Sequence, residues 1–222
     1  MVKWGVIGTG SISTAFCDSI KYSKQGKLSA VASRSSKNLK KFTDKYQVNT
    51  FDSYDALLDD SSIDAVYIGT PHNSHYELSL KTLRSGKHLL CEKPMTMNST
   101  EAMILLNEAR VNNLFFMEAF MYRCHPLTHK MLEIVKQEFS DQEVLIESSF
   151  GFTADVTEDH RLKNPTLGGG SILDIGCYPL SMARLIAGNL MGKSFSDPIS
   201  ISASGNLSSE NIDLNAKAEI RF

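Results

Sequence analysis

Short apolar runs alternate with helical patterns up to about residue 120 of this chain of 222 residues. Each apolar run is four to six residues long and is bounded by glycine, proline or polar residues, as buried strands are. The expected strands are Val2–Ile7, Leu28–Ala32, Ala65–Ile68, His88–Cys91 and Leu114–Met117.

Helical patterns fill the intervals between these runs. A stretch after Gly10 continues to Ile20, and Lys37–Tyr46 repeats its apolar residues at helical spacing. Two more helices are expected over Tyr76–Leu83 and up to Asn112. We expect Ser36 and Ser99 to cap the helices that follow them, because a serine hydroxyl accepts a hydrogen bond from a first-turn N–H group. Strands that alternate with helices of this length predict βαβ units and a parallel sheet.

The pattern changes near Pro126. One helix is expected over Leu127–Phe139, an alternating and therefore strand-like stretch over Val144–Phe152, and a second helix from Ser171 to about Ala187. Two strand-like segments, Ile199–Gly205 and Ile212–Phe222, follow. This part is expected to be α+β with an open, mostly antiparallel sheet. Because the sequence stops within a strand pattern, which would expose an unpaired edge, we expect this sheet to be incomplete.

Composition excludes several classes of protein. The formal net charge is −2, which argues against a nucleic-acid or membrane partner, since both attract a basic surface. No apolar run approaches the ~20 residues that span a bilayer, and the first residues lack a signal peptide's apolar segment, so a cytoplasmic protein is expected. The four cysteines form no Cys-x-x-Cys pair, so we expect reduced, mostly buried thiols and no metal site.

A glycine-rich turn follows the first expected strand and opens the first helix. The sequence Gly-Thr-Gly-Ser-Ile-Ser is a G-x-G-x-x-G motif whose third glycine is replaced by Ser13. In this context the helix N-terminus is expected to bind a pyrophosphate, with slightly looser helix packing at Ser13. The alternative is an ordinary strand–helix turn. The candidate phosphate-binding residues are Gly8, Thr9, Gly10, Ser11 and Ile12.

The end of the second expected strand indicates which dinucleotide binds. An NAD site would place an acidic residue there for the ribose 2′-hydroxyl, but the chain has Ser33, Arg34 and Ser35. An arginine beside hydroxyl groups suits a 2′-phosphate, which favours NADP over NAD by about tenfold to a hundredfold. The alternative is a solvated arginine at a helix start. We therefore expect a Rossmann dinucleotide-binding domain over residues 1–122 and an α+β domain over 123–222.

Three further segments complete a pattern that resembles the Gfo/Idh/MocA oxidoreductase family. They are Glu92–Pro94, Glu118–Arg123 and Gly168–Pro179, in addition to Gly8–Gly10 and Thr70–His75. The segments occur in the family's order through about residue 190. Within the family, the chain is most similar to dihydrodiol dehydrogenases and NADP-dependent D-xylose dehydrogenases.

Three residues are candidates for catalysis. Lys93 follows a parallel strand, at the edge where open α/β sheets place ligands, and Asp174 and Tyr178 are four residues apart on one face of an expected helix. The resemblance maps the family's lysine onto Lys93 and its Asp-x-x-x-His pair onto Asp174 and Tyr178, with tyrosine in the histidine position. It implies that Tyr178 is the general acid/base, that the Lys93 ammonium favours its ionised form, and that Asp174 orients the substrate. The alternative is a surface lysine, a solvated aspartate and a half-buried tyrosine.

The resemblance also implies supporting residues. Thr70, Pro71, His72 and His75 match a loop beside ribose and nicotinamide, although a lone His75 is more often structural. His160 and Arg161 either line the substrate pocket or form a charged loop. Further cofactor contacts are implied for Glu92, Lys93 and Arg123.

These observations together predict an NADP-dependent dehydrogenase. It would transfer a hydride between nicotinamide and a secondary alcohol of a sugar, polyol or trans-dihydrodiol, and assemble as a homo-oligomer through the C-terminal sheet. Two alternatives stay open: a non-catalytic NAD(P)-binding sensor on the same fold, and a truncated remnant of a longer enzyme.

Overall fold

A computed structural model describes residues 1–153, 155, 157 and 160–222 of the chain. The structure divides into two compact units, Met1–Ala119 and Phe120–Phe222.

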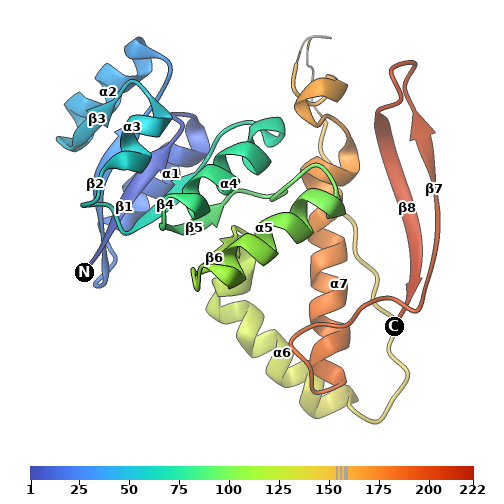
Figure 1. Ribbon diagram of the computed structural model, residues 1–222. Coiled ribbons are helices and arrows are strands. Elements are labelled where there is room, and N and C mark those ends of the chain that lie inside the picture. Colours follow the sequence, from blue (N-terminus) through green and yellow to red (C-terminus); the bar gives the residue numbers. More distant parts are fainter. Residues whose placement is uncertain (154, 156, 158–159) are drawn as a thin grey trace. The chain divides into compact units, whose positions relative to one another are not determined.

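The first unit contains a fully parallel sheet of six strands (Figure 1). Their spatial order is β3-β2-β1-β4-β5-β6, so the order reverses between β1 and β4. This is the doubly wound arrangement that binds dinucleotides at the point of reversal, and it confirms the predicted α/β fold class. The strands are β1 (Val2–Ile7), β2 (Gly26–Ala32), β3 (Asn49–Phe51), β4 (Ala65–Ile68), β5 (His88–Cys91) and β6 (Phe116–Glu118).

Helices cover both faces of this sheet, because successive strand residues point to opposite sides. Val6 packs in a cluster with residues of α1 and α2, whereas its neighbour Ile7 packs with residues of α3, α4 and α5. Both side chains are fully buried. The helices are α1 (Ser11–Ile20), α2 (Ser36–Tyr46), α3 (Tyr54–Asp59), α4 (His75–Arg84) and α5 (Ser99–Val111).

Two predicted caps are displaced by one residue. Ser35, not Ser36, accepts the hydrogen bond from a first-turn N–H group of α2, and Asn98, not Ser99, does so for α5. Both residues have the extended backbone that lets a cap side chain fold back onto the first turn. The pattern analysis also missed β3 and α3, which are three and six residues long, because neither is long enough to show a period.

The second unit contains two long helices and a hairpin (Figure 1). The helices α6 (Pro126–Phe139) and α7 (Cys177–Leu190) pack together, and the Asn189 side chain donates to the Leu132 carbonyl oxygen at 2.8 Å. The predicted helix from Ser171 does not begin as an α-helix: Ile172–Gly176 forms a π-helical turn that leads into α7. Short 3₁₀ turns cover Met121–Cys124 and Pro165–Leu167.

The strand predicted over Val144–Phe152 does not form. The alternating pattern is visible only in the exposure of the side chains: Val144 and Ile146 are half-buried, whereas Leu145 is 85% exposed. No strand among the described residues pairs with this segment. The prediction was wrong because alternation describes one exposed and one covered face but does not supply hydrogen-bonding partners.

The two strand-like segments at the end of the sequence form the predicted antiparallel pair, β7 (Ser200–Leu207) and β8 (Asp213–Arg221). Their register places Ile201 opposite Ile220 and Ala203 opposite Ala218 on one face. The residues between them on each strand are mostly charged, hydroxyl or amide residues. The pair is thus amphipathic, and its apolar face is exposed in this structure. No helix in the described part of the chain is long and apolar enough to cross a membrane.

Candidate functional site

The turn after β1 lies beside the turn after β4, where the strand order reverses. Gly8 has a φ of +102°, and a Cβ atom there would lie 2.8 Å from the carbonyl oxygen of Gly69. Only glycine tolerates both the positive φ and the close backbone approach. Gly8 therefore brings the chain from β1 into α1 close against the end of β4.

Gly10 differs from Gly8, because it is exposed and a side chain there would meet no close contact. The nearest atom to a Cβ built at Gly10 would be 3.9 Å away, and Gly10 is the N-cap residue of α1 without a capping side chain. The next two residues, Ser11 and Ile12, are exposed. An uncapped helix N-terminus presents N–H groups and the positive end of the helix dipole. Together with the space beside Gly10, this end of α1 fits a pyrophosphate group.

The looser packing expected at Ser13 is not found. Ser13 is fully buried, and its hydroxyl donates to the carbonyl oxygen of Gly69 at 3.3 Å. A Cβ atom at residue 69 would overlap the Ser13 oxygen. The room that the motif's third glycine usually provides therefore comes from Gly69 at the end of β4. That compensation cannot be seen in the motif itself.

At the end of β2, the hydroxyl of Ser33 is engaged inside the protein. It lies 2.8 Å from the Thr9 hydroxyl and accepts the Ser35 N–H at 3.2 Å, and Ser33 is 5% exposed. Ser33 thus ties the glycine-rich turn to the end of β2. Arg34 is exposed, and its guanidinium carbon lies 5.7 Å from the centre of the Tyr54 ring. Arg34 forms no salt bridge with any described carboxylate, so it is the charged group here that can meet a phosphate.

The loop after β4 is held by His75, which the resemblance placed beside the cofactor. Its side chain is fully buried, and its two ring nitrogens lie 2.7 Å from the Pro94 carbonyl oxygen and 2.8 Å from that of Thr70. Burial lowers the pKa of His75, because desolvation disfavours the charged ring. Pro71 is exposed, and His72 is 8% exposed with its ring 5.8 Å from that of His75. His75 therefore contacts the two loops rather than open space.

Glu92 and Lys93 follow β5. The Glu92 carboxylate accepts the Tyr67 hydroxyl at 2.7 Å and the Lys93 backbone N–H at 3.3 Å. Burial and the adjacent carboxylate raise the pKa of Tyr67. Glu92 thus fixes the backbone on which the half-buried Lys93 side chain is mounted, just before a cis peptide bond to Pro94.

Two residues near this segment were missed by the sequence analysis. The Tyr67 ring is stacked on Phe16, with the ring centroids 4.1 Å apart. This stacking fixes the position of the Tyr67 hydroxyl, which donates a hydrogen bond to Glu92. The Glu118 carboxylate accepts the Met95 N–H at 2.8 Å, just after the cis peptide bond. Tyr67 lies within an apolar run and is therefore expected in the core. Only its hydroxyl group could have indicated in the sequence that it contacts Glu92.

In the second unit, Asp174 lies in the π-helical turn and Tyr178 in the first turn of α7. Asp174 is 5% exposed and forms a salt bridge to Arg161 at 2.8 Å. The Tyr178 ring packs edge-on against Phe120, with centroids 5.4 Å apart, and tilts against Phe150 at 5.6 Å. The structure thus places Asp174 and Tyr178 on consecutive turns and brings Arg161, but not the exposed His160, to Asp174.

Asp213, at the start of β8, was not predicted. Its carboxylate accepts the Ser171 hydroxyl at 2.7 Å and the Ile172 N–H at 2.6 Å, at the start of the π-helical turn. Gly170 has a φ of +116°, and a Cβ atom there would overlap the Asp213 carboxylate. Asp213 therefore caps the turn that carries Asp174, across about 40 residues of sequence. Such a contact has no local sequence signal.

The remaining predicted residue, Arg123, belongs to the second unit and is half-buried in the 3₁₀ turn Met121–Cys124. The adjacent Tyr122 donates its hydroxyl to Ser181 of α7 at 2.8 Å, which fixes this turn against the helix that carries Tyr178. The predicted site residues therefore fall in both units, with the phosphate-binding candidates and Lys93 in the first, and Asp174 and Tyr178 in the second.

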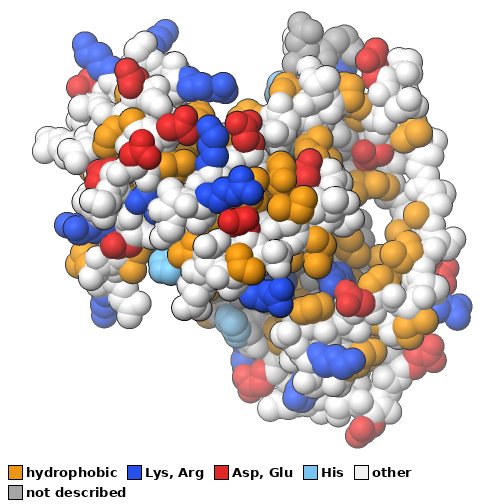
Figure 2. All heavy atoms as spheres, in the orientation of Figure 1, with side chains coloured by type: hydrophobic (Ala, Val, Ile, Leu, Met, Phe, Trp, Pro, Cys, Tyr) orange, Lys and Arg blue, Asp and Glu red, His pale blue; other side chains and the backbone are white. Residues whose placement is uncertain are grey.

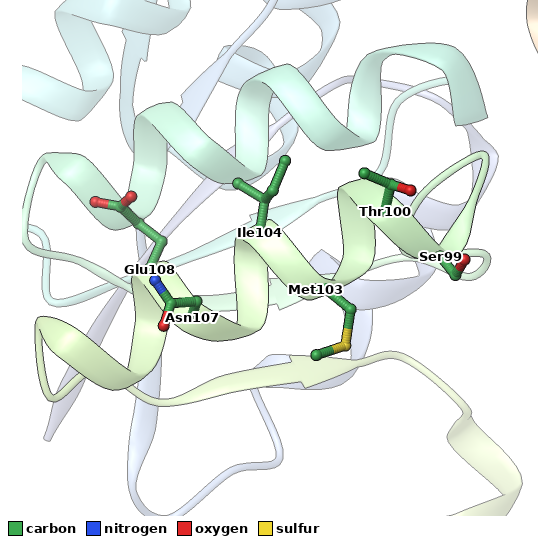
Figure 3. Close-up of a pocket in the computed structure, with 6 residues that line it drawn as sticks. All are labelled: Ser99, Thr100, Met103, Ile104, Asn107 and Glu108. Carbon is green, nitrogen blue, oxygen red and sulfur yellow. The ribbon is translucent and has the colours of Figure 1, made fainter.

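The surface charge, the cysteines and the surface pocket along α5 indicate no further site residue among the described residues. Lysine, arginine and acidic side chains are interspersed on the face shown in Figure 2. Among the described residues, no three His, Cys, Asp or Glu side chains are grouped as a metal site would require. Cys17 and Cys91 are buried, which raises the pKa of each thiol to about 12, but Cys124 is exposed. A hollow along α5, lined from Ser99 to Glu108, contains no predicted site residue (Figure 3).

Comparison with known sequences establishes the class of protein. The chain belongs to the Gfo/Idh/MocA family, because the family model described as "Oxidoreductase family, NAD-binding Rossmann fold" matches residues 2–120. The resemblance inferred from the motifs is thereby confirmed.

Two relatives within this family are named dehydrogenases. The chain is 36% identical over 189 residues to "D-xylose 1-dehydrogenase (NADP(+)) 2" of Haloferax volcanii, an alignment that covers 84% of the chain and 58% of the relative. It is 32% identical over 187 residues to "Trans-1,2-dihydrobenzene-1,2-diol dehydrogenase" of Xenopus tropicalis, with 83% and 56% covered. The chain spans about half the length of the curated relatives it matches.

Solved structures agree with the fold. A 3-ketoreductase from Actinomadura kijaniata, determined with NADP and TDP-benzene, matches with a TM-score of 0.81 and 28% sequence identity. The match covers 99% of this chain and 66% of that one. An NAD-binding protein from Listeria innocua matches with a TM-score of 0.79 and 25% identity, over 99% of this chain and 63% of that chain.

Proposed function

We propose that the chain is the nucleotide-binding and catalytic part of an NADP-dependent oxidoreductase that acts on a secondary alcohol. The observation that carries this proposal is the carboxyl edge of the parallel sheet. There, the uncapped end of α1 is exposed at Gly10, and Arg34 occupies the end of β2, where an NAD enzyme has an acidic residue. NADP is also the cofactor named for the xylose dehydrogenase and present with the ketoreductase.

Each part of the cofactor has residues that fit it. The N–H groups at the start of α1, from Gly10 to Ile12, would hold the pyrophosphate. Arg34, oriented by Tyr54, would pair with the 2′-phosphate, with Ser35 beside it. Ser33 and Thr9 would act indirectly, because their hydroxyls hold the two turns together. The loop that begins with Thr70 and Pro71 would lie next to the nicotinamide, as the family resemblance implies.

Three residues would take part in catalysis. Bound NADP⁺ would accept the hydride from the substrate carbon. The Lys93 ammonium would hold the substrate hydroxyl and stabilise negative charge on its oxygen, and the Tyr178 hydroxyl would exchange the proton. Asp174, held by Arg161, would orient a second substrate hydroxyl.

The substrate class is proposed from the relatives. Two of the relatives that the chain resembles are named for D-xylose and for a trans-dihydrodiol, two compounds with adjacent hydroxyl groups. We propose a sugar, polyol or dihydrodiol as the substrate. The exposed apolar face of β7 and β8 supports a homo-oligomer that assembles through this hairpin.

Turnover with a panel of alcohols tests the proposed function. The purified chain would be mixed with NADP⁺ and D-xylose, other sugars, polyols or a trans-dihydrodiol, and the appearance of NADPH followed. Lys93→Met should lower kcat by about a hundredfold or more, because it removes the charge at similar volume. Lys24→Met, at an exposed loop lysine, is the matched control and should behave as wild type. Turnover by wild type that survives unchanged in Lys93→Met would refute the assigned role, and NADP binding without any turnover would favour a sensor.

A further inference from the structure

His75 connects two loops of the first unit through their backbones. Its Nδ1 atom lies 2.7 Å from the Pro94 carbonyl oxygen, and its Nε2 atom lies 2.8 Å from the Thr70 carbonyl oxygen. Thr70 follows β4 and Pro94 follows β5, which are neighbouring strands with Ile68 opposite Cys91. The imidazole ring therefore bridges the two loops at the carboxyl edge of the sheet.

The two contacts are chemically unusual, because carbonyl oxygens only accept hydrogen bonds. A neutral imidazole has one N–H group and can satisfy one of these carbonyls, whereas the charged ring satisfies both. The ring and its contact to the Pro94 carbonyl are buried, so bulk water does not replace a missing partner there, whereas the contact to the Thr70 carbonyl is only partly buried. Which nitrogen carries a hydrogen thus decides which loop the side chain holds.

The loop that Nδ1 reaches contains Lys93. The Pro94 carbonyl belongs to the residue directly after Lys93, and the Lys93 N–H is held on its other side by Glu92. The backbone around Lys93 is thus fixed from both sides by buried or half-buried side chains. The Cα and Cβ atoms of Lys93 therefore keep their position even when the ammonium group at the end of the side chain moves.

We propose that His75 is a positioning residue: its Nδ1–H donates to the Pro94 carbonyl and thereby sets where the Lys93 side chain enters the site. This inference rests on the proposed function insofar as it concerns catalysis by Lys93. His75 does not contact the reacting groups, since it is completely enclosed by the two loops.

Three substitutions separate the two contacts. His75→Asn keeps a donor near the Nδ1 position, His75→Gln keeps one near the Nε2 position, and His75→Phe keeps ring volume without either donor. If Nδ1 positions Lys93, kcat should fall about tenfold to a hundredfold in His75→Phe and His75→Gln, but less than about fivefold in His75→Asn. All three variants should still bind NADPH, because the turns proposed to hold its pyrophosphate and 2′-phosphate are untouched.

A merely structural role would give a different pattern. All three variants would then lose thermal stability, and kcat per folded molecule would equal that of wild type. Equal kcat values for His75→Asn and His75→Gln, or a wild-type kcat in His75→Phe, would overturn the proposal.

A second readout is independent of turnover. Lysines would be labelled with ¹³C-methyl groups, and the Lys93 signal, assigned by its loss in Lys93→Arg, followed by NMR. The signal should shift in His75→Gln and His75→Phe and stay near its wild-type position in His75→Asn. An unmoved signal in all variants would refute the positioning role. If the wild type turned over no alcohol, the proposed function would fail, and this NMR result would still decide the inference about His75.

Discussion

Two glycine-bearing turns, one in each unit, lead into helices that carry predicted site residues, yet they are built in opposite ways. The turn at Gly8–Ser13 leaves space beside Gly10, at the uncapped start of α1. The turn at Gly168–Asp174 has no such space at Gly170, because the Asp213 carboxylate caps its N–H and hydroxyl donors from β8.

The difference separates a binding turn from a positioning turn. The exposed N–H groups of an uncapped helix start bind water or an anion, and in the proposed function the pyrophosphate binds them beside Gly10. A helix start capped by its own chain binds no anion, but it holds Asp174 and Tyr178 in place. We therefore expect substitutions in the first turn to alter cofactor binding and substitutions near the second to alter turnover.

The largest expected effect comes from Tyr178. Tyr178→Phe should lower kcat by about 10²–10⁴ while NADPH binding is retained, because it removes a proton-transferring hydroxyl and leaves the first unit unchanged. Steady-state kinetics and an NADPH titration measure the two quantities. Tyr122→Phe, which removes a neighbouring hydroxyl bonded to Ser181, is the matched control and should retain turnover within about tenfold. Loss of NADPH affinity in Tyr178→Phe would contradict the assignment of cofactor binding to the first turn and of turnover to the second.

Gly69 should have the next largest effect, on the first unit. Gly69→Ala should lower the free energy of unfolding by about 1–3 kcal/mol, because its methyl group would overlap the Ser13 hydroxyl. Ser13→Gly in the same chain should restore most of that loss. Urea unfolding of the two single variants and the double variant measures the coupling. Additive effects would show that Gly69 does not replace the motif's third glycine.

Asp213 is the corresponding test in the second unit. Asp213→Ala should destabilise the π-helical turn by about 1–2 kcal/mol, because the Ile172 N–H and the Ser171 hydroxyl lose their acceptor. Hydrogen exchange at the Ile172 amide should accelerate, and NADPH affinity should stay unchanged. Asp141→Ala, at an exposed aspartate of the same unit, serves as the control. Unchanged exchange at Ile172 would show that the cap is dispensable.

A smaller effect is expected from pH. The folded chain holds the pKa of His75 below its ordinary value of 6.5, so the unfolded chain binds a proton more readily in that range. Stability from this group is complete above about pH 6.5 and is lost as the pH falls towards the folded-state pKa. Burial is the main cause; Glu92 favours the charged ring, Lys93 disfavours it, and the His72 ring lies 5.8 Å away. Urea unfolding from about pH 7 to pH 5 should show this slope in wild type and a shallower one in His75→Asn, and equal slopes would contradict it.

The first unit was predictable to a large extent because its central strands are buried where they meet the helices. Ala65–Ile68 reads as a continuous apolar run, Val2–Ile7 ends in the buried residues Gly5–Ile7, and the glycine-rich turn between strand and helix is a local signal. What escaped were β3 and α3, too short for periodicity, and the exchange between Ser13 and Gly69, which involves residues far apart in sequence.

The second unit was less predictable for a physical reason. The alternation over Val144–Phe152 was real, but a strand also needs a partner, and none was encoded locally. Asp174 and Tyr178 could be chosen from the motif, whereas their supports, Arg161 and Asp213, act through contacts with no sequence period. The sequence indicated for Arg161 only that it lines the substrate pocket or belongs to a charged loop.

The most direct test of the account is a titration of the folded chain with NADPH and NADH, for wild type and for Arg34→Ala. Charge-assisted hydrogen bonds of about 1.5–3 kcal/mol from Arg34 to the 2′-phosphate predict about tenfold to a hundredfold tighter binding of NADPH by wild type. In Arg34→Ala the two affinities should become similar through the loss of NADPH binding alone. Tighter NADH binding by wild type would contradict the role of Arg34, and no binding of either cofactor to a folded sample would contradict the proposed oxidoreductase.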